Sequence, residues 1–168
     1  MNRDTLVTQL TLNDYVLSKN VEGMSHEDSL KQPREGGNSV NWVMGHVVRS
    51  RNTALALMSV PSAIDDAKYE IYNDQPLADP KKAVRFEDIL SSFKAMQPRF
   101  IEGIQNLAAE KAAQPAPFSP SGNPNETLGS LLDAFVFHET YHLGQTGVLR
   151  RITGKPGVLK PPKAGQTA

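Results

Sequence analysis

Two histidines and a glutamate lie close together in the stretch FVFHETYHLGQ, residues 135–145. His138, Glu139 and His142 match H-E-x-x-H, a pattern in which two histidines bind zinc and the glutamate acts as a general base. Side chains at positions i and i+4 share a helix face, so the two imidazoles could bind one metal ion. They could also be buried structural histidines, but two close, buried imidazoles are hard to satisfy without a metal. We therefore predict a metal site at this pair.

A metalloprotease needs a third ligand, which proteases with this motif usually take from downstream. After Glu139 the chain has no Asp or Glu, and after His142 it has no further His. The longer form H-E-x-x-H-x-x-G-x-x-H also fails, because Gln145 stands at its glycine and Val148 at its last histidine. These departures argue against a protease.

The remaining two histidines lie upstream. His26, in the polar stretch MSHEDSL, is expected to be an exposed loop or capping residue. His46 lies on a row with Val43 and Leu57 that borders an apolar stripe, which makes it the best third ligand that the sequence offers. The alternative for His46 is a histidine at a boundary between helices. The neighbouring Gly45 has no side chain and could let another group approach closely.

The composition excludes several classes of protein. The chain has 168 residues, with 18 Lys and Arg against 18 Asp and Glu, whereas nucleic-acid binders need excess positive charge. No run approaches the roughly 18 apolar residues that span a membrane, and the N-terminal stretch MNRDTLVTQL lacks the apolar segment of a signal peptide. Because there is no cysteine, metal ligands must be His, Asp or Glu. We expect a soluble, cytoplasmic protein that acts on a small molecule, without nucleic-acid or membrane partners.

Four amphipathic helices are predicted to position the histidines, from apolar residues at three–four spacing. They cover residues 5–21, 40–58 and 86–107, and a fourth segment that starts near Asn125 or Thr127 and ends before Gly154. The inward row of the first helix is Val7, Leu10, Asp14, Leu17 and Val21, and that of the last is Leu131, Phe135, His138, His142, Gln145 and Leu149. Both histidines of the pair therefore point where apolar side chains point.

No strand pattern is visible, so the predicted fold is all-α, an antiparallel four-helix bundle with long connecting loops. A single domain is expected over residues 1–155, followed by an extended or disordered tail over 156–168. The irregular connections at 61–84 and 115–125 could supply a substrate pocket.

The segments NWVMGHVVRSRN and, later in the chain, HETYHLGQTGVLRR resemble the DinB/YfiT-like superfamily of metal-dependent enzymes. These proteins are four-helix bundles with one histidine on the second helix and H-x-x-x-H, usually followed by x-G-Q, on the last. The resemblance covers roughly residues 40–152. It implies that His46, His138 and His142 bind a divalent metal, zinc or nickel, and that the protein forms a homodimer.

The resemblance also implies metal-dependent chemistry. Relatives include transferases that activate a low-molecular-weight thiol at the metal, so we expect a thiol S-transferase-like enzyme that directs a thiol at an electrophile. One alternative is a hydrolase that activates water at the metal. Another is a non-enzymatic protein of a stress response that binds a metal or a small ligand.

Gln145 and Glu139 are the candidate catalytic residues. Gln145 could hydrogen-bond a ligand imidazole or the substrate. Glu139 lies about 100° around the helix from His138, so it could orient an imidazole, but the sequence favours a solvated or interface charge. Gly144 is expected to allow close packing of helices. Trp42 could line a pocket, although aromatic residues in bundles usually belong to the core.

Overall fold

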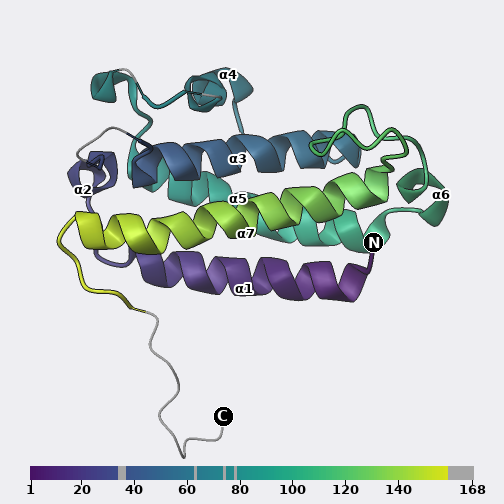
Figure 1. Ribbon diagram of the computed structural model, residues 1–168, viewed down its shortest axis with the longest axis horizontal. Coiled ribbons are helices and arrows are strands. Elements are labelled where there is room, and N and C mark those ends of the chain that lie inside the picture. The colour runs from purple at the N-terminus through teal and green to yellow at the C-terminus, as the bar shows by residue number, and fades with distance from the viewer. Residues whose placement is uncertain (34–36, 63, 74, 78, 159–168) are drawn as a thin grey trace, which may run out of the picture.

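The computed structural model describes residues 1–33, 37–62, 64–73, 75–77 and 79–158, and the regular secondary structure in these ranges is helical. The four long helices are α1 (Arg3–Val21), α3 (Val40–Leu57), α5 (Phe86–Asn106) and α7 (Leu128–Ile152) (Figure 1). Short helices lie in the connections: α2 (His26–Leu30), α4 (Asp66–Tyr69), η1 (Glu70–Tyr72), η2 (Pro80–Lys82) and α6 (Ala109–Ala112). The prediction of an all-helical fold is confirmed.

The long helices pack side by side, with α1 and α3 each in contact with both α5 and α7. Arg51, near the end of α3, hydrogen-bonds Glu139 on α7. Trp42, near the start of α3, faces His142, which comes later in α7, so α3 and α7 are antiparallel. The start of α1 lies beside the end of α5, so this pair is antiparallel as well.

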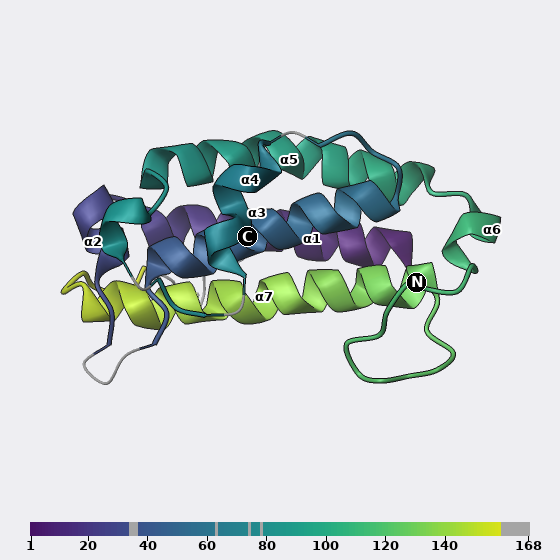
Figure 2. The same ribbon diagram turned by 90° about the horizontal axis from the view of Figure 1, so that it is seen from above.

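The other two neighbouring pairs are parallel, which departs from the antiparallel arrangement expected from the sequence. Asn13 on α1 bonds Glu139 and Asn20 bonds Thr146, so α1 and α7 run in the same direction. The start of α3 likewise lies beside the start of α5. The reason is the connection after α3, which holds α4 and both 3₁₀ helices and runs back along the bundle (Figures 1 and 2). Consequently α5 begins at the end of the bundle where α3 began.

The helix starts follow from local hydrogen bonds. The side chains of Asn2 and Ser39 accept from backbone N–H groups in the first turns of α1 and α3. Thr127 and Ser130 form a reciprocal capping box at the start of α7. His26 also caps a helix, because its Nδ1 accepts from the N–H of Phe86 at the first position of α5. The prediction of a capping role for His26 is therefore confirmed.

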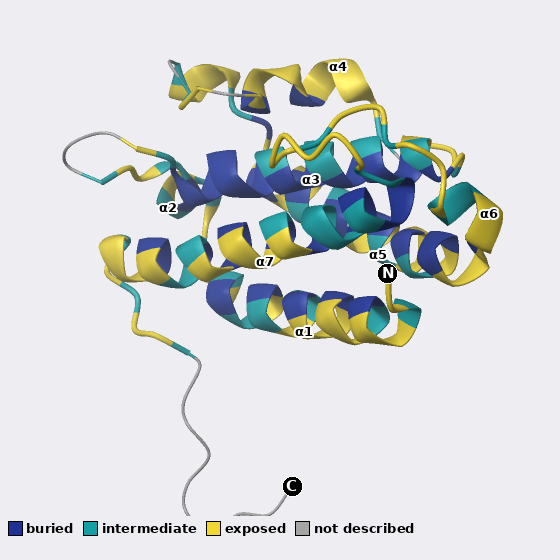
Figure 3. Cartoon of the chain, turned by 45° about the vertical axis from the view of Figure 1, so that its right-hand side comes forward, coloured by how far each residue is buried: buried dark blue, intermediate teal, exposed yellow. Residues whose placement is uncertain are grey.

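The buried face of α1 differs from the predicted one by a rotation of about one residue. Its buried side chains are Leu6, Leu10, Asn13, Leu17 and Asn20. The two asparagines replace apolar residues because each has hydrogen-bond partners on α7. Asp14 is therefore only half-buried, at the edge of this face. Figure 3 shows α3 as the most deeply buried of the long helices.

Two further predictions concern the limits of the domain and membrane-spanning segments. The domain limits, a unit over residues 1–155 and a tail, stay a prediction, and residues 159–168 of that tail lie outside the described part. Among the described helices, none is both long and apolar enough to cross a membrane.

Candidate metal centre

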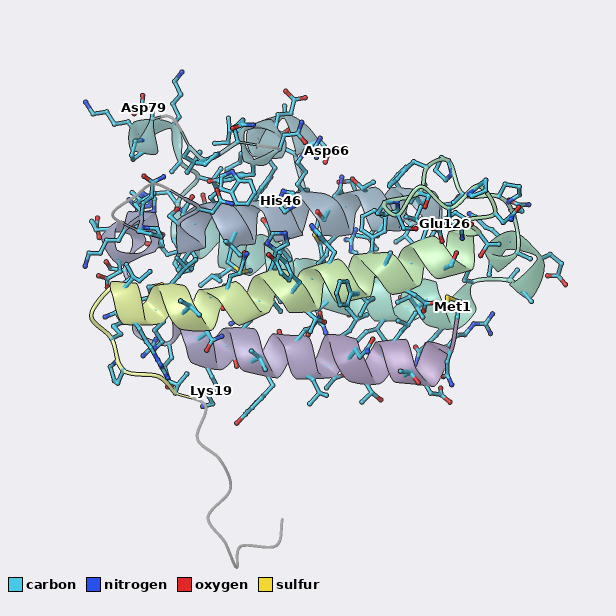
Figure 4. All side chains as sticks on the ribbon, in the orientation of Figure 1. Met1, Lys19, His46, Asp66, Asp79 and Glu126 are labelled. Carbon is cyan, nitrogen blue, oxygen red and sulfur yellow. The ribbon has the colours of Figure 1, made fainter. Side chains whose placement is uncertain are left out.

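Three histidines meet in the middle of the bundle, one from α3 and two from α7. Figure 4 labels His46, midway along α3 beneath the segment that contains α4. The Nε2 atom of His138 lies 3.1 Å from Nε2 of His46 and 3.0 Å from Nε2 of His142. Within the described residues, these three side chains form the group whose potential ligand atoms all lie within 4.8 Å of one another. The structure thus brings together the three histidines that the sequence singled out.

Neighbouring groups determine which ring nitrogen carries the proton in two of the histidines. The backbone carbonyl of Tyr72 lies 2.9 Å from Nδ1 of His46 and can only accept, so this nitrogen donates. The side-chain oxygen of Gln145 likewise accepts from Nδ1 of His142 at 2.9 Å. Both Nε2 atoms are therefore unprotonated, with their lone pairs directed at His138. Gln145 thus hydrogen-bonds one imidazole of the pair, as the sequence suggested, whereas the role of His142 as a metal ligand stays a prediction.

This arrangement lacks protons for the contacts between the Nε2 atoms. His138 can donate one proton from Nε2, to His46 or to His142 but not to both, so the other contact has no proton between its two nitrogens. A cation bound by all three nitrogens removes that conflict. The spacing also fits, because two nitrogens about 2.0–2.1 Å from a tetrahedral zinc lie about 3.3 Å apart. The donor set therefore suits a divalent metal.

Burial lowers the pKa of His138 and of His142 and so favours their neutral forms, which metal ligation requires. Burial, and to a smaller extent the positive charges that His142 and His46 would carry, lowers the pKa of His138 to about 4. The pKa of His142 is also lowered, mainly by burial, against the opposing effect of its hydrogen bond to Gln145. At neutral pH these two imidazoles have free lone pairs.

The lowered pKa values predict how the metal-free protein responds to acid. The unfolded chain takes up protons at these histidines near pH 6.5, whereas the folded chain takes them up only at lower pH, about 4 for His138. The free energy of unfolding should therefore decrease as the pH falls from 6.5 towards 4. Urea denaturation of the metal-free protein at several pH values measures this decrease, and His138→Gln should make it shallower. An identical pH profile for the variant would contradict the role assigned to burial.

Comparison with known proteins places this site in a family. The sequence model of the DinB superfamily matches residues 9–146, which include all three histidines. The chain belongs to the DinB superfamily. A search of curated proteins finds no match.

In this DinB protein, two aromatic residues hold His46 in place. One is Trp42 on α3 itself, and the other is Tyr72 in the connection after α3. The Trp42 ring stacks on the His46 imidazole at a centroid distance of 4.8 Å, and its Nε1 donates to the Gln75 carbonyl. Tyr72 is fully buried, and its hydroxyl donates to Asn41 and accepts from a backbone N–H. Both aromatic residues thus tie the connection to the start of α3.

Gly45 is what lets Tyr72 come so close, as the sequence suggested. A Cβ at Gly45 would lie 2.5 Å from the Tyr72 ring, which is nearer than atoms can pack. We expect Gly45→Ala to lower the free energy of unfolding by about 1–3 kcal/mol, because the buried ring cannot move aside without losing its hydrogen bonds. It should also weaken zinc binding, since the Tyr72 carbonyl orients His46. Chemical denaturation and zinc titration measure both effects.

Ser50→Ala is the matched control for Gly45→Ala, because it adds helix propensity on the same helix without approaching Tyr72. Unchanged stability and zinc affinity in Gly45→Ala would show that Tyr72 does not position His46.

Glu139 lies elsewhere than the sequence suggested. Its side chain is buried and forms a two-point ion pair with Arg51, at 2.6 Å from Nε and 2.8 Å from the guanidinium NH2. Asn13 donates to the same carboxylate at 3.0 Å. The interpretation of Glu139 as a solvated or interface charge is therefore wrong. Both of its oxygens are bound by Arg51 and Asn13, so it is not free to act as the general base of a protease.

Sequence reasoning missed Arg51, which belongs to the core. Its guanidinium also donates to the Phe93 carbonyl and lies over the Phe93 ring, 3.6 Å from the centroid. The charge pair thus joins α3, α5 and α7 one turn from the histidines, and Asn13 adds α1. This network sets how α3 and α7 lie against each other, and so where their histidines meet.

A cavity of about 480 Å³ opens beside the histidines, and His46 and His138 form part of its wall. Both predicted connections contribute to it, through Asn73 from one and Phe118 and Pro120 from the other. Its remaining lining residues come from α3 and α7: Arg49, Ser50, Thr53, Leu131, Ala134, Phe135, Phe137 and Tyr141. Trp42 is buried against His46 and is not part of this lining. A metal at the histidines would therefore face a space large enough for a small molecule.

Proposed function

We propose that this DinB protein binds one divalent metal ion, zinc or nickel, through the Nε2 atoms of His46, His138 and His142. The observation that carries the proposal is their convergence at the wall of a cavity, with two imidazoles already oriented by Tyr72 and Gln145. Three neutral ligands leave the charge of the metal uncompensated, and a fourth position can stay open to the cavity.

We further propose that the protein is a metal-dependent, thiol S-transferase-like enzyme. A divalent metal held here supplies Lewis acidity, which lowers the pKa of a thiol or water bound beside it. The chain has no cysteine, so a sulfur nucleophile must be a low-molecular-weight thiol that enters the cavity. The aromatic side chains of Phe118, Phe135 and Phe137 in its wall offer an apolar surface for the apolar part of an electrophile. Gln145 contributes by holding His142 in the ligating orientation.

An assay of the zinc- or nickel-loaded protein on a panel of epoxides, alkyl halides and esters, with and without small thiols, tests this function. The transferase proposal predicts products that contain the thiol and no turnover in its absence. Turnover of esters without a thiol would instead establish the hydrolase alternative. A protein that binds metal tightly but turns over nothing on the panel would favour the non-enzymatic alternative.

We also propose that the protein forms a homodimer through an exposed face of α7. Phe137, Tyr141, Val148 and Ile152 are large apolar residues at three–four spacing, and all four are exposed. Gly144 lies between them, and an added Cβ there would meet nothing within 4 Å. No helix of the described chain packs on Gly144, so we propose that the close helix packing expected there is with the helix of a second copy.

Analytical ultracentrifugation of the wild type and of Val148→Glu tests the dimer. We expect the wild type to sediment as a dimer and the variant as a monomer, because a glutamate would be buried without a partner. Thr8→Glu, an exposed change on α1, is the control and should leave the dimer intact. A monomeric wild type at micromolar concentration would contradict the proposal.

A further inference from the structure

The cavity beside the histidines has an uneven charge. Of its described lining residues, Arg49 is the only one that carries a full charge at neutral pH, and none is acidic. A divalent metal at the histidines would add further positive charge to the same wall. A ligand that enters this space meets cationic groups and, among the described lining residues, no carboxylate that neutralises them, which favours an anionic ligand.

Arg49 itself has an unused guanidinium. Within the part of the chain that the structure describes, its side chain has no ion-pair partner. Its backbone carbonyl accepts a hydrogen bond from the Thr53 hydroxyl, and this contact does not involve the guanidinium. Arg51, two residues later, shows the contrast, because its guanidinium is saturated by Glu139 and the Phe93 carbonyl. Arg49 is half-buried on the cavity wall, and its guanidinium has no hydrogen-bond acceptor among the described residues, so it is suited to a carboxylate, which it can bind at two points.

The position of Arg49 relates it to the histidines. His46, Arg49 and Thr53 follow one another at three–four spacing, so they line the same face of α3 towards the cavity. Positions three apart on a helix have Cβ atoms about 5–6 Å apart. A short molecule can therefore reach Arg49 with one end and the histidines with the other. Between and opposite them, Leu131, Phe135 and Phe137 offer an apolar surface.

We propose that Arg49 is a specificity-determining residue that binds the carboxylate of a small amphipathic acid. The apolar body of this acid packs on Phe135 and Phe137, and its reactive end, a thiol or an electrophilic carbon, lies at His46 and His138. The placement of the reactive end rests on the proposed function. The carboxylate contact does not, because Arg49 carries its charge with or without metal.

The test compares binding of 3-phenylpropionate with that of its uncharged amide, to both the zinc-loaded and the metal-free protein. Trp42 is the single tryptophan of the chain and stacks on His46, so its fluorescence reports binding in this region. We expect the wild type to prefer the acid at least about tenfold in both forms, as for a charged hydrogen bond. In the metal-free protein, where no metal charge contributes, Arg49→Gln should abolish the preference and Arg49→Lys should restore part of it.

Arg151→Gln, the same charge change at an exposed position outside this cavity, is the control and should leave the preference intact. Zinc content and the midpoint of urea unfolding should be unchanged in Arg49→Gln, since the guanidinium makes no hydrogen bond or ion pair to any residue that the structure describes. Equal binding of acid and amide by the wild type, binding of neither, or a preference that persists in metal-free Arg49→Gln would overturn the proposal. Failure of zinc to bind would instead overturn the proposed function, while the metal-free measurement still decides on Arg49.

Discussion

Glu139→Gln is expected to lower the free energy of unfolding by about 3–5 kcal/mol, because it leaves the guanidinium of Arg51 charged and buried without its counter-ion. Arg51 is 1% exposed and Glu139 is 2% exposed, so water cannot replace the lost partner. The glutamine can still accept one hydrogen bond, but it cannot balance the charge. Urea denaturation of the metal-free protein measures the loss.

A double variant separates the charge from the packing. Arg51→Met combined with Glu139→Leu removes both charges and keeps most of the volume, so we expect it to recover much of the stability lost by Glu139→Gln. If the single variant is as stable as the wild type, the ion pair is not the buried network described above. Each variant also needs a zinc titration. Glu139→Gln should still bind zinc, provided it is folded, because Glu139 is not among the ligands.

His142→Ala is the second change with a large expected effect, the loss of stoichiometric zinc binding. Two imidazoles on different helices cannot hold a divalent metal against water and buffer as three can. The metal-free variant should still fold, because with His142 removed the one proton on Nε2 of His138 satisfies its remaining contact, to His46. Zinc titration followed by Trp42 fluorescence and by elemental analysis measures the loss.

Gln145→Ala provides a graded comparison for His142→Ala. This change leaves all three ligands but removes the acceptor that orients His142, so the affinity for zinc should fall by about 10–100-fold and not vanish. Zinc binding by His142→Ala that matches the wild type would show that the metal ligands lie elsewhere.

The sequence was sufficient to predict the four long helices and the convergence of the three histidines. Amphipathic spacing marks each long helix, and an i, i+4 pair of histidines must share a face whatever the rest of the fold does. The third histidine, His46, required a judgement about which helix face is inward, and here the apolar stripe of α3 is long enough to show it. The direction of α5 relative to α3 was beyond this reasoning, because it depends on the path of the connection after α3.

Arg51 and Glu139 were not predicted to be buried, because only apolar side chains were expected in the core. Val40, Met44, Val47, Ala54 and Met58 leave a gap on the inward row of α3, and the residue that fills it at three–four spacing is Arg51. Glu139 similarly fills a gap on the row that contains Leu132, Val136 and Leu143 of α7. A positive and a negative residue at inward positions of two helices indicate a buried pair, and that signal was present in the sequence. The sequence held no comparable signal for Tyr72, since it lies in the connection between α3 and α5, where no helical apolar pattern shows which side chains are buried.

The central claim is that the three histidines form a site for one divalent metal. Elemental analysis of the wild type, purified without a histidine tag, tests it most directly, together with equilibrium dialysis against zinc and nickel. We predict about one divalent ion per chain, with saturation at that ratio. Protein that contains no divalent metal as purified, and that binds none from micromolar zinc or nickel at neutral pH, would contradict the claim.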